Sequence, residues 1–225
     1  VETATAQPAD AARLRASFHK NKTVLAASTH EGEDSIILES FAKLRKAHPD
    51  LRLILAPRHP ARADKIQALA LTFGLDVSRR SANDAPENTP VYLADTLGEM
   101  ALWYALAGFT FVGGSLVDNG GHTPFEPAQF GSVVLHGPFV SNHAAAFNAM
   151  AKAGGALKVK NAVELEATLD ALIMAPSEAA QLAQSGTEAL AKLRTSDTAM
   201  AAFWSAVDDA IQTRKETPPP KQSQF

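Results

Sequence analysis

The chain of 225 residues contains no cysteine, so disulfides, thiolate metal sites and cysteine nucleophiles are all excluded. It also lacks an excess of charge of one sign: 21 Lys and Arg stand against 24 Asp and Glu, for a net charge of −3. This balance argues against a broadly basic surface for nucleic acid. With 46% hydrophobic and 7% aromatic residues, the composition is that of a globular protein long enough to bury a core.

Long hydrophobic runs are scarce as well. Residues 1–10 have neither the basic region nor the apolar region of a signal peptide, so we expect none. Residues 100–117 form an uncharged run of 18, the length at which a membrane span becomes possible. Gly108 and the pair Gly113–Gly114 interrupt this run, and we interpret it as a short helix followed by a buried strand.

Short apolar runs alternate with longer amphipathic stretches along most of the chain. The pattern predicts strands at residues 23–27, 51–56, 75–79, 91–93, 109–112, 133–135 and 156–159. It predicts helices at residues 34–47, 61–73, 97–106, 124–130, 143–152, 162–174, 177–194 and 199–213. Strands separated by helices form parallel sheets covered on both faces, so the expected fold is α/β, a doubly wound parallel sheet.

The same pattern suggests how the chain is divided. We expect residues 1–19 to be an N-terminal lead-in and residues 20–175 to form the α/β domain. Helices within 176–214 should pack on that domain, and the polar, proline-rich tail 215–225 should be disordered.

In an open parallel sheet, ligands bind beyond the carboxyl ends of the strands, and the unusual residues of this chain cluster there. Ser28 and Thr29 follow the first strand and can offer hydroxyl and backbone N–H groups to an anion. Alternatively, this stretch is simply a capped helix start, with Glu33 and Asp34 placed for the helix dipole. Both interpretations remain open.

An Arg–His pair follows the second strand. Pro57 and Pro60 bracket Arg58 and His59, and the fixed φ of proline restricts where the arginine points. A fixed guanidinium suits a phosphate or a carboxylate, whereas the alternative is an ion pair with a nearby Asp. We favour the ligand, because an arginine beyond a buried strand faces the crevice.

The segment 95–99 follows the strand at 91–93. Asp95 or Thr96 is a natural N-cap, with Glu99 close to the capping-box position. Capping alone explains these residues.

A glycine-rich stretch follows the strand at 109–112. Gly113 and Gly114, followed by Ser115, permit a close backbone approach to a ligand. His122 and Glu126 are spaced i, i+4, and both face the crevice if the next helix begins at residue 124. Such a pair can also bind a metal, but no third ligand is evident nearby, so we expect no metal.

The loop 136–142 follows the strand at 133–135. Its polar side chains, Asn142 among them, could contact a sugar or a base, or they could serve the turn itself.

Six segments occur in a distinctive order: ASTHEGE (27–33), PRHP (57–60), DTLGE (95–99), FVGGSL (111–116), GGHTPFEPA (120–128) and HGPFVSN (136–142). Together they make residues 20–175 resemble the C-terminal half of the 3-deoxy-D-manno-octulosonic acid (Kdo) transferases. Two positions depart from that family: Thr123 replaces the usual Asn, and His143 replaces an aromatic residue.

The resemblance implies a GT-B glycosyltransferase, in which two Rossmann-like domains face each other across a cleft. The C-terminal half binds the donor CMP-Kdo, while the N-terminal half carries a membrane anchor, the acceptor site and a catalytic carboxylate. This chain has one such unit, so we expect a soluble, inactive donor-binding half with no catalytic residue, metal or cofactor of its own. The whole enzyme would transfer Kdo with inversion to lipid IVA at the cytoplasmic face of the inner membrane of a Gram-negative bacterium. It would bind no nucleic acid, and only the missing N-terminal part would associate with the membrane.

The resemblance also implies particular roles. Arg58 would bind the phosphate or the Kdo carboxylate, Glu126 the ribose, and His122 and Asn142 would line the nucleotide or sugar. The full set of implied CMP-Kdo-binding residues is Ser28, Thr29, Arg58, His59, Gly98, Glu99, Gly113, Gly114, Ser115, His122, Thr123, Glu126 and Asn142.

Two alternatives remain beside this interpretation. One is another nucleotide-sugar enzyme on the same fold, such as a UDP-sugar transferase or a UDP-sugar 2-epimerase. The other is a nucleotide-binding or protein-interaction module without catalytic activity. Fold analogy alone does not choose between them.

Overall fold

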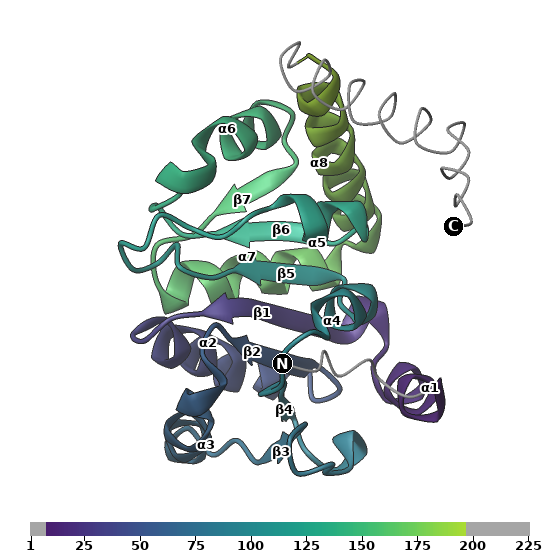
Figure 1. Ribbon diagram of the computed structural model, residues 1–225, viewed down its shortest axis with the longest axis vertical. Helices are drawn as coiled ribbons and strands as arrows, with labels where there is room; N and C mark the ends of the chain where they lie inside the picture. Colours follow the sequence, from purple (N-terminus) through teal and green to yellow (C-terminus); the bar gives the residue numbers. More distant parts are fainter. Residues whose placement is uncertain (1–7, 197–225) are drawn as a thin grey trace, which may run out of the picture.

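A computed structural model describes residues 8–196 of the chain, and its centre is a single parallel sheet (Figure 1). The strands stand in the order β3-β4-β2-β1-β5-β6-β7, and every neighbouring pair is parallel. Their bounds are β1 (Thr23–Thr29), β2 (Arg52–Pro57), β3 (Val77–Arg79), β4 (Val91–Leu93), β5 (Phe109–Val112), β6 (Val133–His136) and β7 (Ala156–Lys158). All seven predicted strands are confirmed, each within two residues of its expected bounds.

Helices separate the strands. They are α1 (Pro8–Ser17), α2 (Glu33–Ala47), α3 (Ala63–Thr72), α4 (Met100–Leu106), α5 (Phe125–Gln129), α6 (Ala144–Lys152), α7 (Ala162–Met174) and α8 (Pro176–Ser196). Short 3-10 turns occur at η1 (Lys20–Lys22), η2 (Pro60–Arg62), η3 (Pro86–Asn88) and η4 (Ser141–His143). The helix predicted at 199–213 and the tail 215–225 lie outside the described residues.

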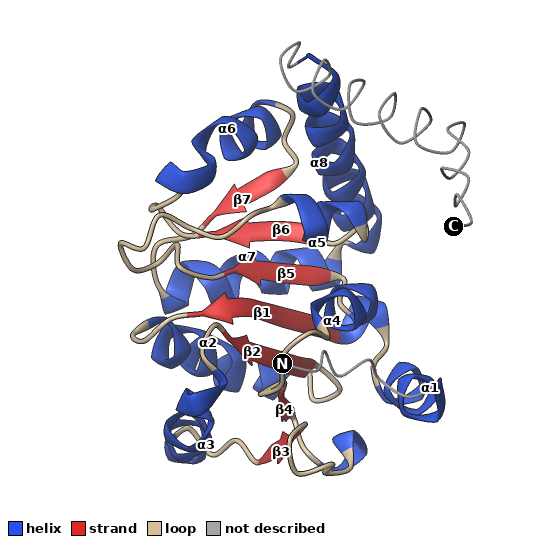
Figure 2. Cartoon of the chain, in the orientation of Figure 1, coloured by secondary structure: helices blue, strands red, loops and turns tan. Residues whose placement is uncertain are grey.

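The sheet is covered on both faces, because successive side chains of a strand point to opposite sides. On β1, Val24 and Ala26 belong to one buried cluster, which α2, α3 and α7 complete. Leu25 and Ala27 belong to a second cluster, with α1 and α4. Figures 1 and 2 show α7 behind the sheet and α4 in front of it. The predicted doubly wound α/β fold is confirmed.

Two differences from the sequence-based expectation concern helix positions. The segment expected as a lead-in contains α1, and Leu14 and Phe18 are each 3% exposed within the cluster around Tyr92 and Trp103. The helix expected from residue 97 begins at Met100 instead, with no side-chain cap at its first turn.

The last described helix, α8, lies against the β6–β7 end of the sheet. Thr187 on α8 donates a hydrogen bond of 2.6 Å to the carbonyl oxygen of Ala128 on α5. Leu190 is buried with Val134 of β6 and Met150 of α6. Residues 176–196 therefore pack on the sheet as part of the same body.

The uncharged run 100–117 folds as α4, β5 and the turn after β5, as the glycines in it predict. Among the helices of the described residues, none combines the length and the hydropathy needed to cross a bilayer.

The strand order reverses between β1 and β5. From β1 the chain proceeds through β2 to the β3 edge of the sheet, then returns to the other side of β1 at β5 and continues to β7. In open α/β sheets, ligands bind outside the carboxyl ends of the strands at this reversal point. The loops that follow β1 and β5 are therefore where the fold places a site.

Candidate functional site

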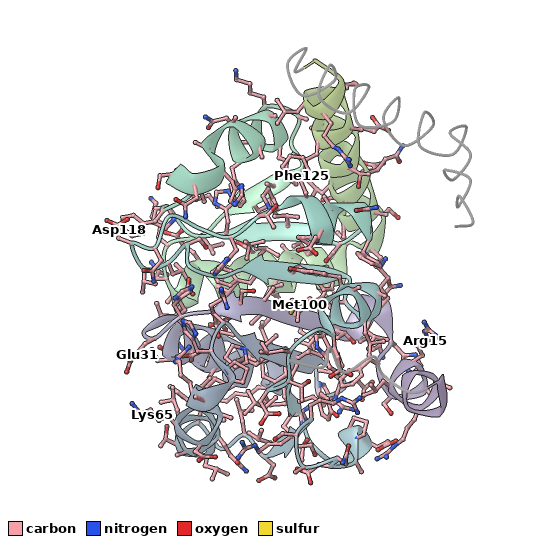
Figure 3. The ribbon with its side chains drawn as sticks, viewed as in Figure 1. Arg15, Glu31, Lys65, Met100, Asp118 and Phe125 are labelled. Carbon is pink, nitrogen blue, oxygen red and sulfur yellow. The ribbon has the colours of Figure 1, made fainter. Side chains whose placement is uncertain are left out.

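The loops after β1 and β5 lie at the same edge of the sheet. Figure 3 labels Glu31 from the first loop and Asp118 from the second at the edge to which the strand arrowheads point, with Arg15 at the opposite edge. The two strand ends touch through their backbones, because the N–H of Gly113 donates to the carbonyl oxygen of Ala27 at 2.8 Å. A Cβ on Gly113 would lie 2.4 Å from the carbonyl oxygen of Ser28. Glycine is thus required at position 113 because the backbone of β1 leaves no room for a side chain. The sequence had instead suggested that Gly113 allows the backbone to approach a ligand.

A buried carboxylate fills the centre of these loops. Glu33 on α2 accepts hydrogen bonds from the backbone N–H groups of Gly114 (2.7 Å), Ser115 (3.0 Å) and Leu116 (2.9 Å) after β5. It also accepts one from the N–H of His30 at 2.9 Å. The N–H groups at Gly113–Ser115 are therefore engaged within the fold: that of Gly113 donates to β1, and the other two donate to Glu33. Contact of these residues with the donor stays a prediction.

Two hydroxyl groups of these loops, including that of Thr29, which was expected to meet an anion, are used inside the fold. Ser115 is fully buried; its Oγ donates to the carbonyl oxygen of Val112 at 2.5 Å and accepts from the N–H of Gly137 at 2.8 Å. Thr29 is also fully buried, and its Oγ1 donates to Asp34 at 2.7 Å. Neither hydroxyl reaches the edge where a ligand would bind.

Arg62 takes the structural role that was one alternative for Arg58. Its guanidinium pairs with Asp34 and donates to the carbonyl oxygen of Thr29 at 3.0 Å. Burial raises the pKa of Asp34, while the hydrogen bond from Thr29 and the charge of Arg62 oppose that rise.

Arg58 lies free at the edge. Its backbone N–H donates to the carbonyl oxygen of Thr29 at 3.0 Å, which fixes the start of its side chain beside β1. The side chain is exposed, and its guanidinium makes no hydrogen bond or ion pair with any residue in 8–196. Asp34, which could have paired with Arg58, pairs with Arg62 instead. Arg58 therefore remains available to an anionic ligand.

Three imidazoles gather beside Arg58. The Nε2 atoms of His30 and His122 are 2.9 Å apart, and their rings are nearly parallel, with centroids at 5.1 Å and planes 18° apart. We call His30 and His122 the imidazole pair. The ring of His59 stands edge-on to that of His30 at 6.1 Å. The structure thus brings together His59, His122 and Arg58, as predicted for a site at this edge, and adds His30.

The surroundings of the imidazole pair lower the pKa of both rings. Burial lowers the pKa of His30, and the nearby His59, Arg62 and Arg58 act in the same direction against Glu33. Burial likewise lowers the pKa of His122, helped by His30 and Arg58. The cation that remains exposed beside these rings is Arg58, whose guanidinium suits phosphate or carboxylate oxygens.

The remaining predicted residues of the glycine-rich loop serve partly to shape it. Asn142 donates to the carbonyl oxygens of Asn119 (3.1 Å) and Gly121 (3.4 Å), and so ties the loop after β6 to the loop after β5. Thr123 accepts from the N–H of Phe125 at 3.3 Å, at the start of α5.

Glu126 is exposed on α5, whereas His122 lies three residues before that helix begins. The helix begins at Phe125, one residue later than the start at residue 124 from which we expected His122 and Glu126 to face the same crevice. That shared orientation stays a prediction. Within residues 8–196, no group of three histidine or carboxylate side chains is placed to hold a metal ion.

The segment 95–99 lies apart from this cluster. Glu99 is 5% exposed and pairs with Arg80 at 2.8 Å, while Gly98 has the positive φ of a turn, +87°. Asp95 binds Ser81 and Arg79; although burial raises its pKa, these bonds hold the pKa below its usual value. Glu99 is thus already paired within the fold, and the contact of Gly98 and Glu99 with the donor stays a prediction.

His30 and Glu33 were missed as site residues from the sequence. The signal for His30 was present, because it directly follows a buried strand within the segment that supplied Ser28 and Thr29. Glu33 looked like a charge for its own helix dipole, and no local pattern indicates partners 81 to 83 residues away. Ser28 itself has φ +56° at a register shift of β1, so its backbone is held in an unusual conformation between the two loops.

The opposite edge of the sheet also has a hollow, of about 520 Å³. Its walls include Lys22, Asp50, Arg52 and Glu87, and Lys22 pairs with Asp50 there at 3.0 Å. It lies at the amino ends of the strands, away from the reversal point, so we assign the candidate site to the carboxyl edge.

Comparison with known structures defines the class. The chain matches the C-terminal CMP-Kdo binding domain of WaaA from Acinetobacter baumannii with a TM-score of 0.74 and 32% identity, over 80% of this chain and 95% of that one. Anabaena Alr3699/HepE in complex with UDP and glucose matches with a TM-score of 0.61 at 14% identity, which shows the fold alone. The chain is a Rossmann-like domain of the GT-B glycosyltransferase fold.

Curated relatives specify the family, although no protein-family model matches the chain. The 3-deoxy-D-manno-octulosonic acid transferase of Haemophilus influenzae is 38% identical over 184 residues, which is 80% of this chain and 43% of that protein. The enzyme of Rickettsia bellii is 35% identical over 156 residues, or 68% of this chain and 37% of that protein. The chain belongs to the Kdo transferase family and spans less than half the length of these relatives. The resemblance carried by the six segments is confirmed.

Proposed function

We propose that the chain is the donor-binding half of a Kdo transferase and that it binds CMP-Kdo at the carboxyl edge of the sheet. The observation that carries this proposal is the unpaired Arg58 guanidinium beside the imidazole pair at the strand-reversal point. The match over 95% of a domain described as CMP-Kdo binding supports it.

Different side chains of the site bind different parts of CMP-Kdo. Arg58 binds the phosphate or the Kdo carboxylate through charge-assisted hydrogen bonds. His59 and the imidazole pair line the same anionic part of the donor. Glu126, which is exposed on α5, accepts hydrogen bonds from the ribose hydroxyls, and Asn142 lines the nucleotide or sugar.

In the whole enzyme this half would supply the leaving-group side of the reaction. CMP departs with its phosphate charge stabilised by the cationic edge, and Kdo is transferred with inversion to lipid IVA. The base that deprotonates the acceptor hydroxyl would lie on an N-terminal half, together with the membrane anchor. We place the reaction at the cytoplasmic face of the inner membrane, without a metal.

Binding of nucleotides to the chain tests the proposal. Isothermal titration should detect CMP binding, with weaker binding of UDP and GDP, and Arg58→Ala should reduce CMP affinity. Arg15→Ala is the matched control, because Arg15 is exposed at the opposite edge (Figure 3). A preference for UDP would favour the UDP-sugar enzymes instead, and no nucleotide binding would favour an interaction module.

A transfer assay tests whether this chain binds the donor without catalysing transfer. With CMP-Kdo and lipid IVA, this chain should form no glycosylated product, because the acceptor site and the base lie elsewhere in the proposal. Turnover by the chain alone would require a base among its own residues, with the exposed Glu31 at the site edge the first to test.

A further inference from the structure

The contact between His30 and His122 constrains their protonation. Their Nε2 atoms are 2.9 Å apart, which is a hydrogen-bond distance. A neutral imidazole carries one N–H and one lone pair, so one ring must donate through Nε2 while the other accepts there. If both rings were protonated, two N–H groups would face each other across this distance. The pair can therefore carry at most one extra proton while the contact persists.

The backbone holds both rings in place. The N–H of His30 is bound by Glu33 at 2.9 Å, and the N–H of His122 donates to the carbonyl oxygen of Gly113 at 3.1 Å. Gly114 lies under both rings: a Cβ there would be 3.3 Å from His30 Cδ2 and 3.4 Å from His122 Cδ2. The contact between the rings is thus built into the two loops.

The surroundings of the imidazole pair disfavour its protonation. The acidic group that faces it, Glu33, is neutralised in part by four backbone N–H groups. The basic groups that face it are Arg58, His59 and Arg62 toward His30, with Arg58 and His143 toward His122. Burial is the largest cause of the lowered pKa of both rings, and these basic groups act in the same direction. An anion placed beside Arg58 would reverse this balance.

We infer that the imidazole pair takes up one proton when a phosphate group binds beside Arg58, and that the protonated pair forms part of the phosphate-binding surface. The proton comes from solvent and attaches to the free Nδ1 of the ring that donates through Nε2. The Nε2–H···Nε2 contact stays intact, no bond to the ligand forms or breaks, and the new Nδ1–H becomes a further donor. This inference rests on the proposed function, because it requires a nucleotide phosphate at this edge.

The proton uptake can be counted with CMP as the probe. Calorimetric titrations at pH 7.5 in buffers of different ionisation enthalpy give the number of protons taken up for each CMP bound. We expect net uptake approaching one proton in the wild-type chain and its loss in His122→Gln. The phosphate of CMP titrates itself, but its contribution is common to both proteins and cancels in the difference. By linkage, uptake of one proton means that CMP affinity falls tenfold for each unit by which the pH rises. His122→Gln should lack this dependence.

His19→Gln is the matched control, because His19 is exposed beside the hollow at the opposite edge and should leave the uptake unchanged. Ring ¹⁵N spectra of the wild-type chain, with and without CMP, give a second readout that needs no variant, and should show one of the two rings becoming protonated. Binding of CMP with the same proton count in wild type and His122→Gln, and with no change in the ring nitrogens, would overturn this inference alone. Absence of CMP binding would overturn the proposed function and this inference with it.

Discussion

Removing the Glu33 carboxylate should destabilise the fold far more than an ordinary helix substitution. Glu33 accepts four backbone hydrogen bonds of 2.7 to 3.0 Å, and it is fully buried. In Glu33→Ala these donors lose their acceptor, and an unsatisfied buried donor costs about 1–3 kcal/mol. Loop relaxation and entry of water reduce the sum, so we expect a loss of about 3–5 kcal/mol in the free energy of unfolding.

Two further variants sharpen this prediction. Glu33→Gln keeps one carbonyl oxygen but turns an NH₂ group toward the remaining donors, so its cost should be roughly half that of Glu33→Ala. Glu39→Ala is the matched control on the same helix, because Glu39 is partly exposed and pairs with Lys43 at i, i+4. That pair is worth about 0.3–0.5 kcal/mol.

Urea unfolding measures all three variants, with the slope m checked for constancy so that the midpoint reports stability. Hydrogen exchange should also accelerate at the amides of residues 114–116 in Glu33→Ala, before the rest of the sheet opens. If Glu33→Ala costs no more than Glu39→Ala, then the buried carboxylate does not hold the two loops together, and our description of the site's framework is wrong.

Four other outcomes follow from the structure. Arg58→Ala should weaken CMP binding about tenfold, or ~1.5 kcal/mol, by loss of a charge-assisted contact; unchanged affinity by calorimetry would move the phosphate elsewhere. Glu126→Gln should weaken CMP binding while leaving the thermal unfolding curve unchanged, and wild-type affinity would remove it from the ribose site. Gly113→Ala should lower the free energy of unfolding, measured with urea, by about 1–3 kcal/mol, because a Cβ there would lie 2.4 Å from the Ser28 carbonyl oxygen; an unaltered unfolding midpoint would contradict that contact. Burial lowers the pKa of His136, so the unfolded chain binds more protons below pH 6.5 and stability falls on acidification by up to ~1.4 kcal/mol per pH unit. His136→Gln should therefore narrow the difference in stability between pH 7.5 and 5.5, and an equal difference would refute the assignment.

The sheet could be predicted from the sequence because its signals are local. Each strand is a short apolar run, and the intervening helices repeat their apolar residues at helical spacing. The helix α1 was not predicted, because Leu14 and Phe18 are too few to make a pattern and are buried by residues distant in the sequence, Tyr92 among them. The start of α4 was misplaced because Asp95, a suitable N-cap, is instead bound by Ser81, 14 residues away.

The location of the site could be predicted from the sequence, but the contacts among its side chains could not. Strand ends located Arg58, His59 and His122 at one edge, since carboxyl ends of parallel strands share an edge. The buried Asp34 forms an ion pair with Arg62 and leaves Arg58 without one. The sequence does not indicate which of these two arginines pairs with Asp34. Similarly, the backbone donors after β5 went to Glu33, a contact that no sequence spacing signals.

Mapping CMP onto the chain by amide and side-chain NMR shifts tests the central claim most directly. We expect the shifts to concentrate in the loops after β1, β2 and β5, with the largest at His30, Arg58 and His122. Shifts concentrated instead around Lys22 and Arg52, at the hollow on the opposite edge, would contradict a donor site at the strand-reversal point.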